Sequence, residues 1–286
     1  MSWAVAIAPV IRSRTMSNFH VLRKIASLPL AALFALPICL GGGNGFAQAE
    51  PVLSPTEQYR AYLIEQISQT LVSAKRLRER AAAHDVDGAK KAWIAARVGW
   101  EKAEVFISGF VSDLDENIDA WPNALNGFHA IEARLFGANT ADVTGATDQL
   151  IYHLTDLDIK IRQIPLNSQG LLNGAARLAY EVGESKADGG ESRYSGTSLD
   201  DMGNNVSGIQ LVYKTIFASP LQASDPQLAQ NTEHTIQQLA SLLSVSDAKS
   251  LEPGKIRTAS EELIVALQTA APKIGLMKPT LEDITQ

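Results

Sequence analysis

Apolar residues recur every three or four positions along most of the chain after residue 50, which is the period of an α-helix. No segment there alternates apolar and polar residues as a half-buried strand would. The clearest apolar stripe consists of Leu150, Leu154, Leu157, Ile161 and Ile164. Pro165 follows directly, where a helix is expected to end. The pattern therefore predicts an all-α fold.

Helix start signals agree with this period. Ser54 precedes Pro55 and Glu57, which is the order of an N-cap, a first-turn proline and the glutamate of a capping box. Caps and breakers together predict about eight helices, near residues 55–83, 87–109, 124–137, 141–164, 168–187, 198–217, 226–245 and 255–274. Short links favour antiparallel neighbours, so we expect an up-and-down helical bundle, arranged as two four-helix bundles end to end.

Residues 1–49 follow a different pattern. Two basic residues precede the apolar run 25–40, and a small-residue sequence ending at Ala49 follows it. This is the order of a secretory signal peptide, and Met16 is its expected true start. We therefore predict cleavage after Ala49, a periplasmic location and one helical domain over residues 50–286.

Two other interpretations of this segment stay open. The sole cysteine, Cys39, could carry a lipid, although Ile38 stands where a small residue normally precedes a lipid-carrying cysteine. An uncleaved membrane anchor would need about 17 to 20 apolar residues, and Pro29 and Pro37 interrupt this run. Cleavage, without stable membrane insertion, is the favoured interpretation.

Charge is unevenly distributed along the chain. The whole chain has 25 basic and 31 acidic side chains and a formal net charge of −6. Four basic and no acidic residues lie in the first 49 positions, so the remainder has 21 basic and 31 acidic side chains, a charge of −10. An acidic protein repels phosphate backbones and attracts cations, so we expect a cationic ligand and no nucleic-acid partner. Without Cys39 the chain has no thiolate, so a metal would be held by oxygen and imidazole.

Two pairs of residues have the spacing of bundle metal ligands. Glu101 and Glu104 lie three apart in one predicted helix, and His129 and Glu132 lie three apart in the next, so each pair projects from one helix face. We expect the pairs to face one another across adjacent helices, as in metal sites of helical bundles. An imidazole among carboxylates favours iron, zinc or copper over calcium.

The simpler interpretations of these pairs stay open as well. Glu101 and Glu104 could line a solvated face beside Arg97 and Lys102, and His129 could be an ordinary buried histidine. Two long polar connections, 111–126 and 187–196, interrupt the helical pattern, and such connections in a bundle usually indicate function or mobility.

Four stretches of the sequence resemble the imelysin-like family, specifically its periplasmic EfeO/EfeM-type iron-uptake components. They are ARVGWEKAEVFISGFVSDLDENIDAW, GFHAIEARLFG, NGAARLAYEVGESKADGGESRYSGTSLDDMGNNVSG and YRAYLIEQISQTL, and they extend over essentially all of residues 50–286. The chain is similar to the shorter form of the family, without a cysteine-bearing cupredoxin domain. Gly196 is a departure, because many EfeO-like chains have histidine there.

The resemblance implies a metal site on the His-x-x-Glu and Glu-x-x-Glu motifs of the family, with two further acidic positions. These residues are His129, Glu132, Glu101, Glu104, Asp119 and Asp201. Asp201 has an alternative role, because with Ser198 it would also form a capping box for the sixth helix.

Three functions follow from the resemblance. The first is a periplasmic protein that binds iron, as Fe²⁺ or Fe³⁺, and delivers it to an iron permease together with other components of an Efe-type uptake system; zinc, copper and calcium are alternative ions. The second is a metal-dependent peptidase of the imelysin type, although Ala133 follows Glu132 and no His-Glu-x-x-His motif is present. The third is binding of an anionic polysaccharide through bridging cations.

Overall fold

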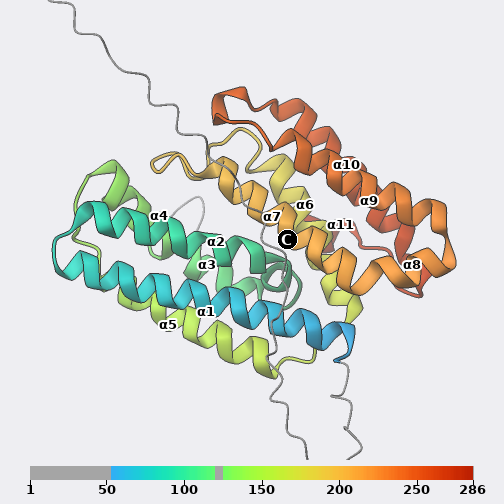
Figure 1. The fold of residues 1–286 in the computed structure, drawn as a ribbon, viewed down its shortest axis with the longest axis horizontal. Coiled ribbons are helices and arrows are strands. Elements are labelled where there is room, and N and C mark those ends of the chain that lie inside the picture. The colour runs from blue at the N-terminus through green and yellow to red at the C-terminus, as the bar shows by residue number, and fades with distance from the viewer. Residues whose placement is uncertain (1–52, 120–124, 286) are drawn as a thin grey trace, which may run out of the picture. The chain divides into compact units, whose positions relative to one another are not determined.

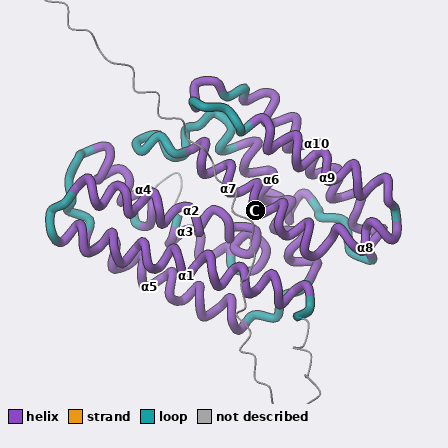
Figure 2. The backbone as a smooth tube through the Cα atoms, viewed as in Figure 1, coloured by secondary structure: helices purple, strands orange, loops and turns teal. Residues whose placement is uncertain are grey.

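The computed structural model describes residues 53–119 and 125–285, and this part of the chain contains helices and no strand (Figure 2). The predicted all-α class is therefore confirmed. The signal peptide prediction for residues 1–49 lies outside the described residues. Among the described helices, none is both long and apolar enough to cross a membrane.

The helices fall into two groups that follow one another along the chain (Figure 1). The first group contains α1 (Pro55–Ala82), α2 (Val86–Phe110), η1 (Ser112–Leu114), α3 (Asp115–Ile118), α4 (Gly127–Glu132), the π-helical segment η2 (Ala133–Gly137) and α5 (Thr144–Gln163). The second contains α6 (Ser168–Glu184), α7 (Ser198–Val212), the π-helical segment η3 (Tyr213–Phe217), α8 (Ala218–Ser224), α9 (Pro226–Leu242), η4 (Ala248–Ser250), α10 (Pro253–Ala270), η5 (Ala271–Ile274) and α11 (Leu281–Thr285).

Helix α2 joins the two groups. It packs against α1 in the first group and against α6 and α7 in the second, while α5 packs on α1 and α10 on α6 and α9. Gly99 allows the close approach of α1, because a Cβ atom there would lie 2.4 Å from the carbonyl oxygen of Gln66. Gly174 does the same for α6, where a Cβ would lie 2.1 Å from the carbonyl oxygen of Val105. Both helix crossings therefore depend on the missing side chain.

Local signals set the helix ends as predicted. The Ser54 hydroxyl accepts a hydrogen bond from the backbone nitrogen of Glu57, and Pro55 is the first residue of α1. Asp85 and Asp225 cap α2 and α9 in the same way. The stripe along α5 is buried from Leu150 to Ile161. These ends are specified by a few neighbouring residues, which is why the sequence predicts them.

The prediction that the sixth helix ends at residue 217 is wrong. The helix passes through the π-helical segment η3 and continues as α8 to Ser224, with Pro220 inside it. Proline has no N–H and its ring collides with the carbonyl group four residues earlier, and a π-helical turn just before it widens the backbone there. The connection 111–126 also contains the short helices η1 and α3, which the sequence did not predict.

Candidate metal centre

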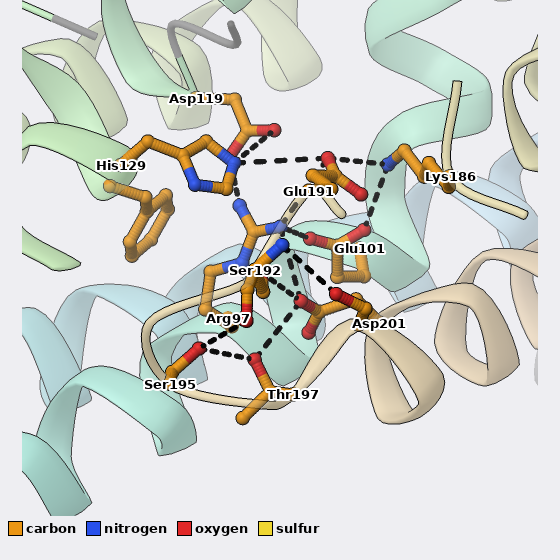
Figure 3. A network of polar contacts seen from close by, with 12 residues as sticks. Arg97, Glu101, Asp119, His129, Lys186, Glu191, Ser192, Ser195, Thr197 and Asp201 are labelled. Carbon is orange, nitrogen blue, oxygen red and sulfur yellow. Dashed lines mark hydrogen bonds and ion pairs between the residues drawn. The ribbon is translucent and has the colours of Figure 1, made fainter. Parts of the chain in front are cut away.

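A cluster of charged side chains is buried where α2, the α3–α4 region, the segment 185–197 and α7 meet (Figure 3). The cluster consists of Arg97, Glu101, Glu104, Asp119, His129, Glu132, Lys186, Glu191, Asp201 and Asn205. Each of these residues is at most 4% exposed. All six metal ligands implied by the sequence are therefore in one place.

Helix α2 supplies one wall of the cluster. Arg97, Glu101 and Glu104 follow a spacing of four and then three, so they share a helix face. The Arg97 guanidinium forms ion pairs with Glu101 and Asp119, and its Nη2 atom lies 3.5 Å from Oδ2 of Asp201. Its carbon Cζ also lies 5.3 Å from the centre of the Phe128 ring. Arg97 is thus held by carboxylates and by an aromatic face.

Lys186 supplies a second cation from the segment that follows α6. Its Nζ atom lies 3.4 Å from Oε2 of Glu101, 3.3 Å from Oε2 of Glu104 and 3.2 Å from Oε1 of Glu191. It also donates to Oδ1 of Asn205 over 3.1 Å. Burial opposes the charge of Lys186, but the surrounding carboxylates raise its pKa well above the usual value. The ammonium group therefore stays charged among four oxygen atoms.

His129 and Glu132, both in α4, border the cluster on another side. Nδ1 of His129 lies 3.0 Å from Oε2 of Glu132. The other oxygen of Glu132 accepts hydrogen bonds from the backbone nitrogens of Tyr194 and Ser195 and from the Ser195 hydroxyl, over 2.8 to 3.1 Å. Burial raises the pKa of Glu132, but the bonds from His129 and Ser195 outweigh this and lower it. Glu132 therefore orients the imidazole.

The imidazole faces two further carboxylates. Nε2 of His129 lies 3.5 Å from Oδ2 of Asp119 and 3.8 Å from Oε1 of Glu191. One ligand atom each from Asp119, His129 and Glu191 lies within 4.8 Å of the others. The same holds for Glu101, Glu104 and Asp119. Asp119 links the two sets, so the glutamate pair and His129 border one connected centre.

Two of the six implied ligands, Glu132 and Asp201, accept hydrogen bonds from the segment 185–197. Both oxygens of Glu132 are engaged by His129 and the segment 185–197, as described above. Asp201 accepts hydrogen bonds from the hydroxyls of Ser192, over 2.6 Å, and Thr197, over 3.1 Å. The capping alternative for Asp201 is not seen, because the Ser198 hydroxyl donates to the carbonyl oxygen of Gly189 and α7 has no side-chain cap.

Glu191 is a candidate ligand that the sequence reasoning missed. It lies in the polar connection 187–196, where Gly189 takes a left-handed turn with φ of 72°. Glu191 is held inward by its contacts with Lys186 and His129, and no regular spacing of residues in this connection predicts that. Glu191 is 1% exposed and its Oε2 atom has no hydrogen-bond partner among the described residues. Burial opposes its charge, but Lys186 and His129 outweigh this and lower its pKa to about 2.

The cluster has more acid than base. Its six carboxyl side chains, Glu101, Glu104, Asp119, Glu132, Glu191 and Asp201, are accompanied in the described chain by two permanently cationic ones, Arg97 and Lys186. Burial raises the pKa of Asp201 to about 7 and that of Glu104 well above its usual value. Buried carboxylates in excess of their counter-ions are costly. A cation with several positive charges would reduce this excess, and carboxylate oxygens with one imidazole suit a hard or borderline ion.

Comparison with known proteins agrees with this architecture. The family model for imelysin matches residues 55–124 and 123–273. The chain is 30% identical over 210 residues to the iron uptake system component EfeO of Escherichia coli K12, covering 69% of this chain and 56% of the relative. It is 30% identical over 196 residues to the component EfeM of Pseudomonas syringae pv. syringae B728a, covering 64% of this chain and 68% of the relative. The chain thus spans a little over half of the length of EfeO.

The fold has a solved counterpart. The structure of a protein assigned as an iron-regulated protein A precursor, from Parabacteroides distasonis, aligns with a TM-score of 0.63 at 16% identity, over 80% of this chain and 97% of that one. At this identity the likeness concerns the fold alone. The match of the family model covers both groups of helices, including every implied ligand. The chain belongs to the imelysin family.

Proposed function

We propose that this protein binds iron at the buried charged cluster and takes part in iron uptake. The excess of buried carboxylates over cationic side chains carries this proposal, because a bound cation reduces that excess without protonating the ligands. The names of the relatives EfeO and EfeM, both iron uptake system components, support iron as the ion.

The proposed ligands are Asp119, His129 and Glu191, with Glu101 and Glu104 completing the set. In the proposed tautomer Nδ1 of His129 carries the hydrogen and donates it to Glu132, and the lone pair of Nε2 then faces Asp119 and Glu191. Carboxylate-rich ligands with one imidazole hold both ferrous and ferric ions, and zinc, copper and calcium are the competing ions. Asp201 is proposed to stay with Arg97 rather than to bind the ion.

We further propose that the protein is exported, is cleaved after Ala49 and works in the periplasm. There it would deliver iron to a permease as part of an Efe-type uptake system. The signal-peptide pattern of residues 1–49 and the acidic charge of the remainder support this location and a cationic cargo.

The geometry favours binding over peptide hydrolysis. A metallopeptidase needs a general base beside a metal-bound water. Glu132, the glutamate nearest to His129 in sequence, has both oxygens engaged by His129, Tyr194 and Ser195. It is therefore poorly placed to accept a proton from water.

The test is iron titration of the purified protein by calorimetry, with elemental analysis of the product. His129→Ala is expected to weaken binding on the order of 100-fold, and Glu132→Gln by about 10- to 100-fold because it only orients the imidazole. The matched control is His234→Ala, since His234 lies on the exposed side of α9. Peptide hydrolysis by the wild type that His129→Ala abolishes, without iron binding by either, would overturn the proposal in favour of a peptidase.

A further inference from the structure

The two cations of the cluster are held in different ways. Arg97 lies on α2, is paired with Glu101 and Asp119, and lies over the rings of Phe128 and Trp93. Lys186 lies beyond the end of α6, in the segment 185–197, on a flexible four-carbon stem. Its contacts within the centre all involve one terminal atom, Nζ. Lys186 is therefore attached to the cluster through a single atom, whereas Arg97 is held by several ion pairs and by two aromatic rings.

The ammonium group of Lys186 takes up the oxygens that an ion needs. Glu101, Glu104 and Glu191 each direct one oxygen at Nζ, over 3.2 to 3.4 Å. An ion bonded to those oxygens at about 2.0 to 2.6 Å would lie almost in contact with the ammonium. Two cations cannot share such a position in a buried place, because the repulsion is screened weakly there. An ion that engages these glutamates must displace Lys186.

We propose that Lys186 is a built-in competitor for the ion, which leaves the three glutamates as iron enters and returns as iron departs. This inference rests on the proposed iron site and adds how that site releases its cargo. Entry begins at Asp119 and His129, which are not among the ion-pair partners of Lys186 in the described chain, together with Glu191, whose Oε2 atom has no hydrogen-bond partner among the described residues. The returning ammonium then replaces the ion on Glu101 and Glu104, so the carboxylates are not left bare.

The competition also affects which ions bind. An ion has to outweigh the attraction of three carboxylates for the ammonium, which favours ions of high charge over monovalent ones. Lys186 therefore lowers the affinity for every ion and raises the discrimination between them. A carrier that must give up its cargo benefits from both effects.

The experiment compares wild type with Lys186→Met, titrated with ferrous iron without oxygen and separately with zinc as a redox-silent probe. We expect Lys186→Met to bind both ions roughly tenfold or more tightly and to release them more slowly to a chelator. Lys102→Met is the matched control, because it removes one charge from the same helix as the glutamate pair and Lys102 forms no ion pair among the described residues.

A second measurement keeps the test decisive if Lys186→Met does not fold. Amine labelling of wild type, read by mass spectrometry, is expected to modify Lys186 slowly without added ion and faster once zinc or iron is bound. Protection of Lys186 in the ion-bound protein would overturn the proposal whatever the affinities are, as would equal or weaker binding by a folded Lys186→Met. Failure of the wild type to bind either ion would instead overturn the proposed iron site, and this inference with it.

Discussion

Helix α2 has two buried faces of opposite character. Toward α1 it presents small residues such as Ala96 and Gly99, and the Thr70 hydroxyl of α1 donates to the carbonyl oxygen of Ala96. Toward α7 and the segment 185–197 it presents Arg97, Glu101 and Glu104. Both faces exclude water, but burial of apolar surface stabilises the fold, whereas burial of charged groups carries a desolvation cost.

The comparison separates stability from function within one helix. The apolar face holds α1 and α2 together through close packing. The charged face consists of side chains that would stabilise the fold more if they were hydrophobic, since buried ion pairs seldom repay their desolvation. Their presence is explained by what they can bind. The buried aromatic side chains Trp93 and Phe128 lie against Arg97 and keep the local dielectric low.

Removal of the central cation should have the largest effect. Arg97→Met leaves Glu101, Asp119 and Asp201 without their shared counter-ion, and we expect the free energy of unfolding to fall by about 3–5 kcal/mol. Urea denaturation in the presence of a chelator measures this. The control is Arg78→Met, which removes an exposed partner of Asp148 and should cause no resolvable loss. Equal losses for both variants would contradict the importance of the buried cation.

A change on the apolar face should cost stability and leave binding alone. The side chain of Gly99→Val would collide with the Gln66 carbonyl and the Thr70 hydroxyl, so we expect a loss of about 1–3 kcal/mol. Iron or zinc affinity, measured on the folded fraction, should stay within about twofold of wild type. A large loss of affinity would show that the two faces of α2 are not independent.

Two carboxyl groups outside α2, Asp201 of α7 and Asp115 of α3, should make stability depend on pH. Burial raises the pKa of Asp201 to about 7 and that of Asp115 to about 6, whereas aspartate in the unfolded chain titrates near 3.9. The folded state therefore holds extra protons, and this contribution to stability is lost as pH rises from about 4 through 7. Glu191, with its pKa lowered to about 2, acts in the opposite sense only below this window.

We accordingly expect metal-free protein to be less stable at pH 8 than at pH 5, by on the order of 1 kcal/mol. Thermal unfolding in a chelator at the two pH values tests this. Asp201→Asn should flatten the difference, and a bound ion should remove it by replacing the protons. Higher stability at pH 8 in the metal-free protein would contradict the assigned pKa shifts.

A change at the N-cap of α1 should have the smallest effect on stability, and it serves as a reference for the other variants. Ser54→Ala removes the cap of α1, and we expect a loss of about 0.5–1 kcal/mol. Chemical denaturation should show this loss unchanged between pH 5 and pH 8 and with or without metal. If the loss depended on either condition, the N-terminal end of α1 would be energetically coupled to the charged face.

The sequence predicted what local signals specify. The predicted helix 55–83 is observed as Pro55–Ala82, and 141–164 as Thr144–Gln163, because caps, prolines and apolar stripes act over a few residues. The passage of α7 into α8 was missed, since Pro220 normally ends a helix and the π-helical turn that accommodates it has no clear signature.

The candidate site divides in the same way. Spacing placed His129 and Glu132 on one face, and this is observed in their hydrogen bond. Lys186 and Glu191 belong to a segment without periodicity, so their inward direction depends on tertiary contacts. Arg97 was considered as a surface partner of the glutamates, but it is buried at the centre because α7 covers that face of α2. Assignment of these residues as metal ligands stays a prediction.

The centre is assembled from distant parts of the chain, with Arg97 and Asp201 separated by 104 positions. Such contacts carry a loop-closure entropy cost that contacts within one helix do not carry. Four of the five proposed ligands lie between Glu101 and His129, but Glu191 and the counter-ion Lys186 come from a later segment, so an ion finds the complete ligand set only in the folded protein. It adds stability only to finished molecules, by about 2.7 kcal/mol at a hundredfold excess over its dissociation constant. Cargo loading would thus report that folding is complete.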